Sequence, residues 1–197
     1  MSLHQILWRN QGQVLTPELI VGVLHGAELA ESEPLTASPP IPIPGDWVAA
    51  PNLRASNKRL VLDQHQRVAD WVAQQTACSS HAWAGYACLG LENEAGELLA
   101  GIVLESYNGR NANVHIAGIG RGWMNRNMLV TFFHYCFNHL KLKRLTGLTP
   151  ASNTHSLAFN RHVGFEVEYV MPDGAPDGDL VIQVLRPEHC RYIPKEV

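Results

Sequence analysis

Apolar residues recur at the α-helical period between Met124 and Leu140, and this stripe is the strongest pattern in the chain. Its members are Met124, Met128, Leu129, Phe132, Phe133, Cys136, Phe137 and Leu140. The spacing predicts one amphipathic helix. A glycine-rich segment, Gly118–Trp123, comes before the helix, and the apolar run Val114–Ala117, which is typical of a strand, comes before that segment. After the helix, residues 141–144 place positive charge near its end, where the helix dipole favours it.

The order of strand, glycine-rich turn and helix indicates a binding site for an anion. The first amides of a helix have no acceptor within their own helix, so such a turn can direct several backbone N–H groups at a phosphate. We therefore expect a phosphate-bearing cofactor at the turn Gly120–Asn125, where Arg121 or Arg126 would supply positive charge.

The remaining apolar and polar positions predict a mixed sheet. Strands are expected at about 83–91, 98–107, 112–117, 145–149, 165–171 and 180–185, with further helices at about 63–75 and 153–163. A turn-rich segment, 172–179, is expected to join the last two strands. Three successive strands joined by hairpin turns, followed by helix, strand, helix and two strands, indicate an α+β fold rather than a doubly wound parallel sheet.

The first fifty residues follow a different pattern. A short strand is predicted over 3–8, and a helix over 16–30, because Thr16, Pro17 and Glu18 favour the start of a helix. Prolines then interrupt any regular structure between residues 31 and 51. We therefore expect an N-terminal arm with a proline-rich linker over residues 1–50, which lies across the surface as a strap or linker, and a main domain over residues 51–197.

Composition excludes several classes of partner. Only 17% of the residues are charged and the formal net charge is -3, so nothing draws the chain as a whole toward nucleic acid or an anionic membrane. No apolar run is as long as a membrane span, and the first residues do not resemble an export signal. The four cysteines have no paired spacing. We expect a soluble, cytoplasmic protein with reduced thiols and no metal site.

Between about Leu53 and Ile193 the chain resembles the GCN5-related N-acetyltransferases. The segment Asn153–Phe165 is similar to that family's motif of an Asn, then Ala or Ser, then Gly-Phe, and residues 137–145 are similar to the end of its cofactor helix. Within the family, the chain resembles most the small acetyltransferases of tailed bacteriophages. That resemblance rests on the strand 113–117, on Arg121-Gly122-Trp123 with Arg126, and on the turn 168–174.

The resemblance implies acetyl-CoA as the cofactor and a primary amine, on a protein or a small molecule, as the acceptor. The residues that it places at the cofactor are Gly120, Arg121, Gly122, Trp123, Arg126, Asn153 and Ser156. It also implies that the strands over 112–117 and 145–149 splay apart and leave backbone groups free for the amide-bearing arm of the cofactor.

Two positions depart from the family's pattern. Trp123 and Asn125 stand where the family has small residues in the cofactor turn, and a tryptophan there is expected to crowd the pyrophosphate. Asn160 stands where many members have a tyrosine that protonates the departing thiolate, and an amide cannot do that at neutral pH. Acetyltransferases of the ribosomal-protein type also lack this tyrosine and have a serine at the position of Ser156.

Transfer to an amine requires a base that deprotonates the ammonium group. His115 is the first candidate because it lies on the strand next to the cofactor turn, and Glu105 and Glu168 follow. Each residue also has a structural interpretation. His115 can be a hydrogen-bonded sheet histidine, Asn153 is a favourable helix N-cap, and Trp123 can serve packing alone.

Two functions therefore remain open. The first is an N-acetyltransferase that uses acetyl-CoA. The second is a catalytically weak or inactive domain of the same fold that acts as an interaction or phage-particle assembly module. The second is indicated by Trp123, by the missing tyrosine and by the arm over residues 1–50, through which the chain could bind a protein partner or another copy of itself.

Overall fold

The computed structural model describes residues 43–193, apart from 48, 52, 77–82, 84, 121, 122 and 124. These residues belong to one compact unit, Pro40–Val197. The predicted strand over 3–8 and the predicted helix over 16–30 lie outside the described residues.

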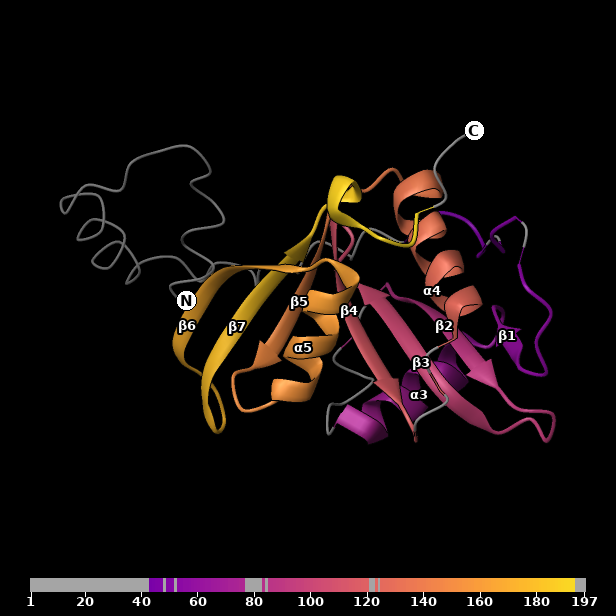
Figure 1. Ribbon diagram of the computed structural model, residues 1–197, viewed down its shortest axis with the longest axis horizontal. Helices are drawn as coiled ribbons and strands as arrows, with labels where there is room; N and C mark the ends of the chain where they lie inside the picture. The colour runs from indigo at the N-terminus through magenta and orange to yellow at the C-terminus, as the bar shows by residue number, and fades with distance from the viewer. Residues whose placement is uncertain are drawn as a thin grey trace, which may run out of the picture. The chain divides into compact units, whose positions relative to one another are not determined.

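The described residues form a seven-stranded sheet with helices on both faces (Figure 1). The strands are β1 (Arg59–Val61), β2 (Ala87–Glu92), β3 (Leu98–Glu105), β4 (Asn111–Gly118), β5 (Arg144–Pro150), β6 (Glu166–Ala175) and β7 (Gly178–Leu185). The helices are α3 (His65–Thr76), α4 (Arg126–Phe133), which continues as the π-helix η3 (His134–His139), α5 (Thr154–Val163) and the 3-10 turn η4 (Pro187–His189).

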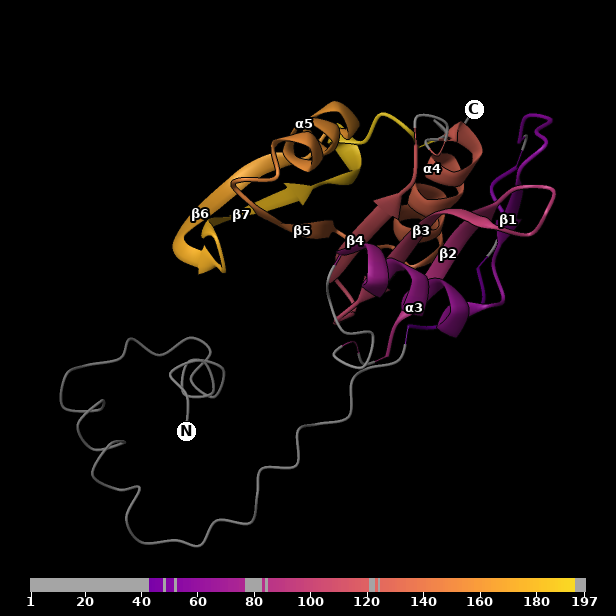
Figure 2. The same ribbon diagram turned by 90° about the horizontal axis from the view of Figure 1, so that it is seen from below.

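The strand order is β1-β2-β3-β4-β5-β7-β6, and every neighbouring pair is antiparallel except β4 and β5. The prediction of a mixed, mostly antiparallel α+β sheet is therefore confirmed. Helix α3 covers one face of the sheet, whereas α4 and α5 lie on the other face (Figure 2). We refer to these as the α3 face and the α4 face.

Side chains alternate along each strand and supply both layers of the core. On the α4 face, Leu89, Ile102 and Val114 belong to the same buried cluster as Phe132 and Phe133 of the helix. On the α3 face, Cys88 and Val103 pack with Val68 and Val72 of α3. The three cysteines among the described residues, Cys88, Cys136 and Cys190, are free thiols.

The stripe from Met124 to Leu140 does not form one uniform α-helix. After Phe133 the helix widens, so that the N–H of Leu140 donates to the carbonyl of Tyr135, five residues earlier, at 2.8 Å. The widened turn carries Tyr135, whose ring stacks on Trp47 with a centroid distance of 4.1 Å and whose hydroxyl donates to the carbonyl of Gly45 at 3.2 Å. The prediction missed the π-helix because Trp47, which packs on Tyr135 of the widened turn, lies far away in the sequence.

Residues 43–57, apart from 48 and 52, have no helix or strand and run beside α4 from its end toward its start. Trp47 is buried against Phe132 and Tyr135. At the other end, the side-chain amide of Asn127 accepts from the N–H of Arg54 at 3.0 Å and donates to its carbonyl at 2.7 Å. This part of the proline-rich region is therefore a strap packed on the helix.

Three strand boundaries differ from the prediction. Strand β1 was not predicted, because three residues are too few to show a pattern. Strand β2 begins at Ala87 rather than residue 83. Strand β6 reaches Ala175, so most of the predicted turn 172–179 is strand. Its proline is tolerated because β6 lies at the edge of the sheet and is irregular between Met171 and Ala175.

No helix among the described residues is long and apolar enough to cross a membrane.

Candidate functional site

Strands β4 and β5 lie side by side only at their starts. Their register pairs Asn111 with Arg144, Ala112 with Leu145 and Asn113 with Thr146, and no later residues pair. Beyond these residues β4 continues to Gly118 and β5 to Pro150. The two strands therefore open into a gap, as predicted, and the backbone groups that line it have no ladder partner across it.

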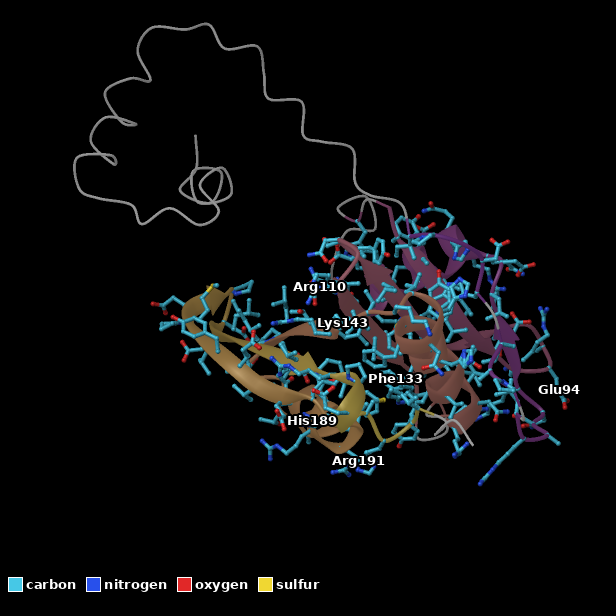
Figure 3. The ribbon with its side chains drawn as sticks, turned by 90° about the horizontal axis from the view of Figure 1, so that it is seen from above. Glu94, Arg110, Phe133, Lys143, His189 and Arg191 are labelled. Atoms are coloured by element: carbon cyan, nitrogen blue, oxygen red, sulfur yellow. The ribbon has the colours of Figure 1, made fainter. Side chains whose placement is uncertain are left out.

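The closed end of this opening is held by backbone hydrogen bonds. The N–H groups of Lys143 and Arg144 both donate to the carbonyl of Arg110, at 2.8 and 3.2 Å. Arg110 and Lys143 lie close together at this end (Figure 3). On the α3 face, the hydroxyl of Thr146 donates to the side-chain oxygen of Asn111 at 2.7 Å. These contacts fix where the two strands separate.

His115 and Glu105 form a pair on the α3 face beside the opening. Strand β3 places Glu105 opposite Asn113, and the next residue of β4 on the same face is His115. The Nε2 atom of His115 lies 3.3 Å from Oε1 of Glu105. The ring of Trp83 lies over that of His115 with a centroid distance of 5.0 Å. An imidazole is thus held between a carboxylate and an indole.

Glu105 is a charged acceptor at neutral pH. Burial raises the pKa of its carboxyl group, but hydrogen bonds from His115, Ser106 and Asn113 more than offset burial, so the pKa lies below its ordinary value. The hydroxyl of Ser106 donates to the Oε2 atom. A carboxylate in this state can fix the orientation of the imidazole and stabilise its protonated form.

Glu168, the third predicted base, does not join this pair. It lies on the edge strand β6, which β7 and β5 separate from β4. Its carboxylate accepts two hydrogen bonds from Arg144, at 2.9 and 3.2 Å, and one from Arg186 at 3.3 Å. The hydrogen bonds from Arg144 lower the pKa of Glu168. A carboxylate bound by two guanidinium groups is a poor proton acceptor, so we assign Glu168 a structural role.

The turn before α4 lies on the other face of the sheet. Gly120 has a φ of 69°, a conformation that glycine adopts without strain. Asn125 is the N-cap, and its side-chain oxygen accepts from the N–H of Asn127 at 2.7 Å. Arg126 is exposed on the first turn of the helix. Arg121 and Gly122 lie outside the described residues.

Helix α5 begins as predicted, at Asn153. The side-chain oxygen of Asn153 accepts from the N–H of Ser156 at 3.1 Å, so the asparagine is a helix cap. Asn160 is further along the same helix, and its amide donates to Gln183 at 2.9 Å and to the hydroxyl of Thr149 at 3.4 Å. Asn160 therefore ties α5 to the sheet and has no proton to give at neutral pH.

Trp123 lies between the end of β4 and helix α5. Its ring packs so closely on Gly118 that a Cβ at that glycine would lie 2.2 Å from the indole. The ring of Phe159 lies on its other side, with a centroid distance of 5.4 Å. Both aromatic residues pack against the core cluster of the α4 face.

Sequence reasoning missed four of the residues at this site. Ser106 and Asn113 stabilise the carboxylate of Glu105, Trp83 covers His115, and Phe159 contacts Trp123. Asn113 is separated from His115 by one residue on a predicted strand, so its side of the sheet could have been inferred from the alternation. Ser106 follows Glu105 directly in the chain, but its positive φ of 53° is not indicated by the alternation. Trp83 and Phe159 depend on contacts between distant segments.

The sheet is mixed, parallel only where β4 meets β5 and open beyond that point. A helix follows each of these two strands. This is the acetyltransferase-like fold that the resemblance predicted. Among solved structures, the chain is similar to a chimera of the spermidine N-acetyltransferase SpeG from Vibrio cholerae and hSSAT. The TM-score is 0.51 at 16% identity, and the match covers 68% of this chain and 97% of that one.

Two further structures are more distant. Mutant forms of the spermidine/spermine N-acetyltransferase SpeG from Vibrio cholerae match with a TM-score of 0.47 at 17% identity, over 54% of this chain and 69% of that one. A probable acetyltransferase matches with a TM-score of 0.46 at 22% identity, over 52% of this chain and 62% of that one. No model of a known protein family matches the sequence, and no curated protein does.

Proposed function

We propose that the protein is an N-acetyltransferase that transfers an acetyl group from acetyl-CoA to a primary amine. The observation that carries this proposal is the His115–Glu105 pair, which lies directly beside the opening between β4 and β5. His115 would serve as the base on the α3 face, and the N-terminus of α4 would bind the phosphates on the other face.

The residues at the opening fit acetyl-CoA on three counts. Backbone groups of β4 beyond Asn113 and of β5 beyond Thr146 can hydrogen-bond the amides of its pantetheine arm. The turn at Gly120 and the start of α4 can present N–H groups to its phosphates. Exposed Arg126 can pair with a phosphate oxygen. When bound, the cofactor supplies an activated acetyl carbonyl.

The two faces of the sheet would then have separate tasks. The phosphates would be held on the α4 face, and the amine would approach from the α3 face, where His115 lies. His115 would accept the proton of the ammonium group, and Glu105 would hold the imidazole in place and stabilise its protonated form. Since Asn160 already donates to Gln183 and Thr149, the departing thiolate would take its proton from water rather than from this residue.

Calorimetric titration with acetyl-CoA and with desulfo-CoA tests the cofactor site. We expect micromolar binding that Arg126→Ala weakens. The matched control is Arg161→Ala on α5, which is also exposed and which we place outside the site. No binding by the unsubstituted chain at millimolar ligand would contradict the proposal.

Acetylation of a panel of amines tests the base. The panel should include spermidine, because the similar solved structures are named as spermidine acetyltransferases, together with peptides that carry a free N-terminus or a lysine. His115→Ala should lower kcat by about 10²-fold or more at neutral pH, with acetyl-CoA affinity unchanged. Glu168→Gln should leave kcat near its original value, and equal losses in the two variants would argue against His115 as the base.

One observation favours the second function, an interaction module without catalysis. Trp123 packs on Gly118 at the end of β4 and contacts Phe159 of α5, so a bulky ring lies beside the turn that we propose for the phosphates. If the titration detects no acetyl-CoA, the search should turn to protein partners, beginning with residues 1–50.

A further inference from the structure

The rings of Trp123 and Phe159 are in contact on the α4 face, beside the end of β4. Trp123 comes from the turn before α4, and Phe159 from the middle of α5. Their centroids are 5.4 Å apart and the ring planes are tilted by 57°. The contact therefore bridges the two crossover helices across the gap that the diverging strands leave.

Gly118, the last residue of β4, provides the space for the indole. A Cβ at this position would lie 2.2, 2.4 and 2.7 Å from three ring atoms of Trp123. The residue pairs in register with Ala100 of β3, and its backbone does not have a positive φ. The need for glycine at position 118 thus comes from the packed ring and not from the backbone conformation.

The Trp123–Phe159 contact lies beside the end of β4, the strand that leads from His115 toward the start of α4. The indole packs on Gly118 at the end of β4, and Trp123 precedes the N-cap Asn125 by two residues in the chain. The ring also packs on the core cluster of the α4 face, which gives it a defined position. A ligand that ran from α4 along the end of β4 would meet the indole at Gly118.

We propose that Trp123 is a gate whose indole must leave its place on Gly118 before acetyl-CoA can bind. This inference rests on the proposed function. The closed state is stabilised by the contacts of the indole with Gly118 and Phe159, and the open state alone admits the cofactor. The apparent dissociation constant is then the intrinsic constant divided by the fraction of molecules that are open.

Two variants open the gate by different means. Trp123→Ala removes the ring, and Gly118→Ala leaves the ring in the chain but places a methyl group where the ring now lies. We expect each to bind acetyl-CoA and desulfo-CoA about tenfold more tightly than the unsubstituted chain. The double variant should bind no more tightly than Trp123→Ala alone, because the methyl group acts only by displacing the indole.

The matched control is Trp71→Ala, which removes an indole from α3 on the opposite face of the sheet. Its affinity for acetyl-CoA should not change. Thermal unfolding of every variant checks that the fold is kept. Because Trp123→Ala and Gly118→Ala act by different means, a folding defect in one leaves the other as a test.

Movement of the ring can be observed without turnover. In protein labelled with 5-fluorotryptophan, the resonance of Trp123 is assigned by its absence in Trp123→Phe. We expect desulfo-CoA to shift this resonance strongly and the resonance of Trp71 little. A gate that opens on binding predicts that shift, whereas a ring that the ligand neither displaces nor touches keeps its resonance.

The outcomes separate the two proposals. Suppose that the unsubstituted chain binds acetyl-CoA, that both variants bind it with the same affinity, and that the Trp123 resonance does not shift. The gate is then wrong and the proposed function stands. If Trp123→Ala binds more weakly, Trp123 is a contact for the ligand and the gate is again wrong. If the unsubstituted chain does not bind at millimolar ligand, the proposed function fails and the gate with it.

Discussion

The two halves of the sheet are protected from solvent very differently. Strands β2, β3 and β4 have α3 on one face and α4 on the other (Figure 2). Strands β5, β7 and β6 have α5 on the α4 face, but no described helix covers their α3 face. Register places Leu148 and Tyr169 beside the same residue of β7, Ile182, on that face, and they are 44% and 57% exposed.

This difference shows how the fold combines a fixed site with access to it. The residues that we assign to proton transfer, His115 and Glu105, lie on β4 and β3, in the half that is packed on both sides. The apolar open face begins at the neighbouring strand, β5. An acceptor that approaches the pair from the α3 face would therefore meet apolar side chains without displacing part of the core.

The open half is nevertheless protected against pairing with other strands. Its edge strand, β6, contains a proline at position 172, an irregular register between Met171 and Ala175, and acidic residues at 166, 168 and 173. Prolines, bulges and charges are features that discourage edge-to-edge association of sheets. The exposed apolar residues of this half are thus accessible on the face of the sheet, whereas its edge strand discourages pairing with another strand.

The largest effect on stability is expected from truncating a buried side chain in the packed half. Phe132→Ala removes a fully buried ring that contacts Trp47 and Phe133, and it should lower the free energy of unfolding by about 3–5 kcal/mol. Chemical denaturation measures this. Leu148→Ala in the open half should cost less than about 1 kcal/mol, because nearly half of the residue is already exposed to solvent. Equal losses would contradict the contrast between the halves.

An intermediate effect is expected where α5 meets the open half. Asn160→Ala leaves the buried oxygen of Gln183 without its donor, which should lower the free energy of unfolding by about 1–3 kcal/mol. Adding Gln183→Leu removes the unpaired group, so the double variant should recover part of the loss. If the double variant is as unstable as the sum of the two single variants, the hydrogen bond does not explain the effect.

A smaller effect, which depends on pH, is expected from Glu105. Its pKa is lower in the folded protein than in the unfolded chain, so its charged form contributes stability above the unfolded pKa of about 4.3. That contribution disappears as the pH falls through the folded pKa. In Glu105→Gln, stability should therefore fall less steeply below about pH 4.3 than in the unsubstituted protein. Part of the pH dependence of stability should remain in this variant, because the pKa values of Glu92 and Glu168 are also lowered. A curve identical to that of the original protein would contradict the assignment.

The smallest effect is expected on the open face itself. Tyr169→Ser replaces an exposed ring on β6, and the free energy of unfolding should change by no more than about 0.5 kcal/mol. A loss of several times that value in thermal or chemical unfolding would mean that the face is covered in solution, and the contrast between the halves would then have to be revised.

What the sequence predicted depended on how far apart the interacting residues lie. Helix α5 was predicted from Asn153 to Val163 because its cap and its terminating glycine are both local signals. The opening between β4 and β5 followed from resemblance, and the structure shows it in the register. The π-helix after Phe133 could not be predicted, because it accompanies the packing of Tyr135 on Trp47, which is far away in the chain.

The candidate site shows the same difference: single residues were identified from the sequence, but the contacts between them were not. His115 and Glu105 were each identified as a possible base, but their pairing depends on the register of β3 against β4, which a hairpin turn does not fix to the residue. Trp123 was identified as an obstacle to the cofactor from its place in the turn. Its partner Phe159 and its packing on Gly118 join three separate elements, and no periodicity in the sequence indicates that contact.

The strap beside α4 determines where a shortened protein can begin. Trp47 is only 6% exposed and stacks on Tyr135, so a recombinant fragment starting at residue 51 would leave the aromatic surface of the helix bare. Such a fragment would be prone to aggregate during expression, and its behaviour would say little about the missing arm. A start near Pro40, where the compact unit begins, keeps the indole and separates the contribution of the arm from that of the core.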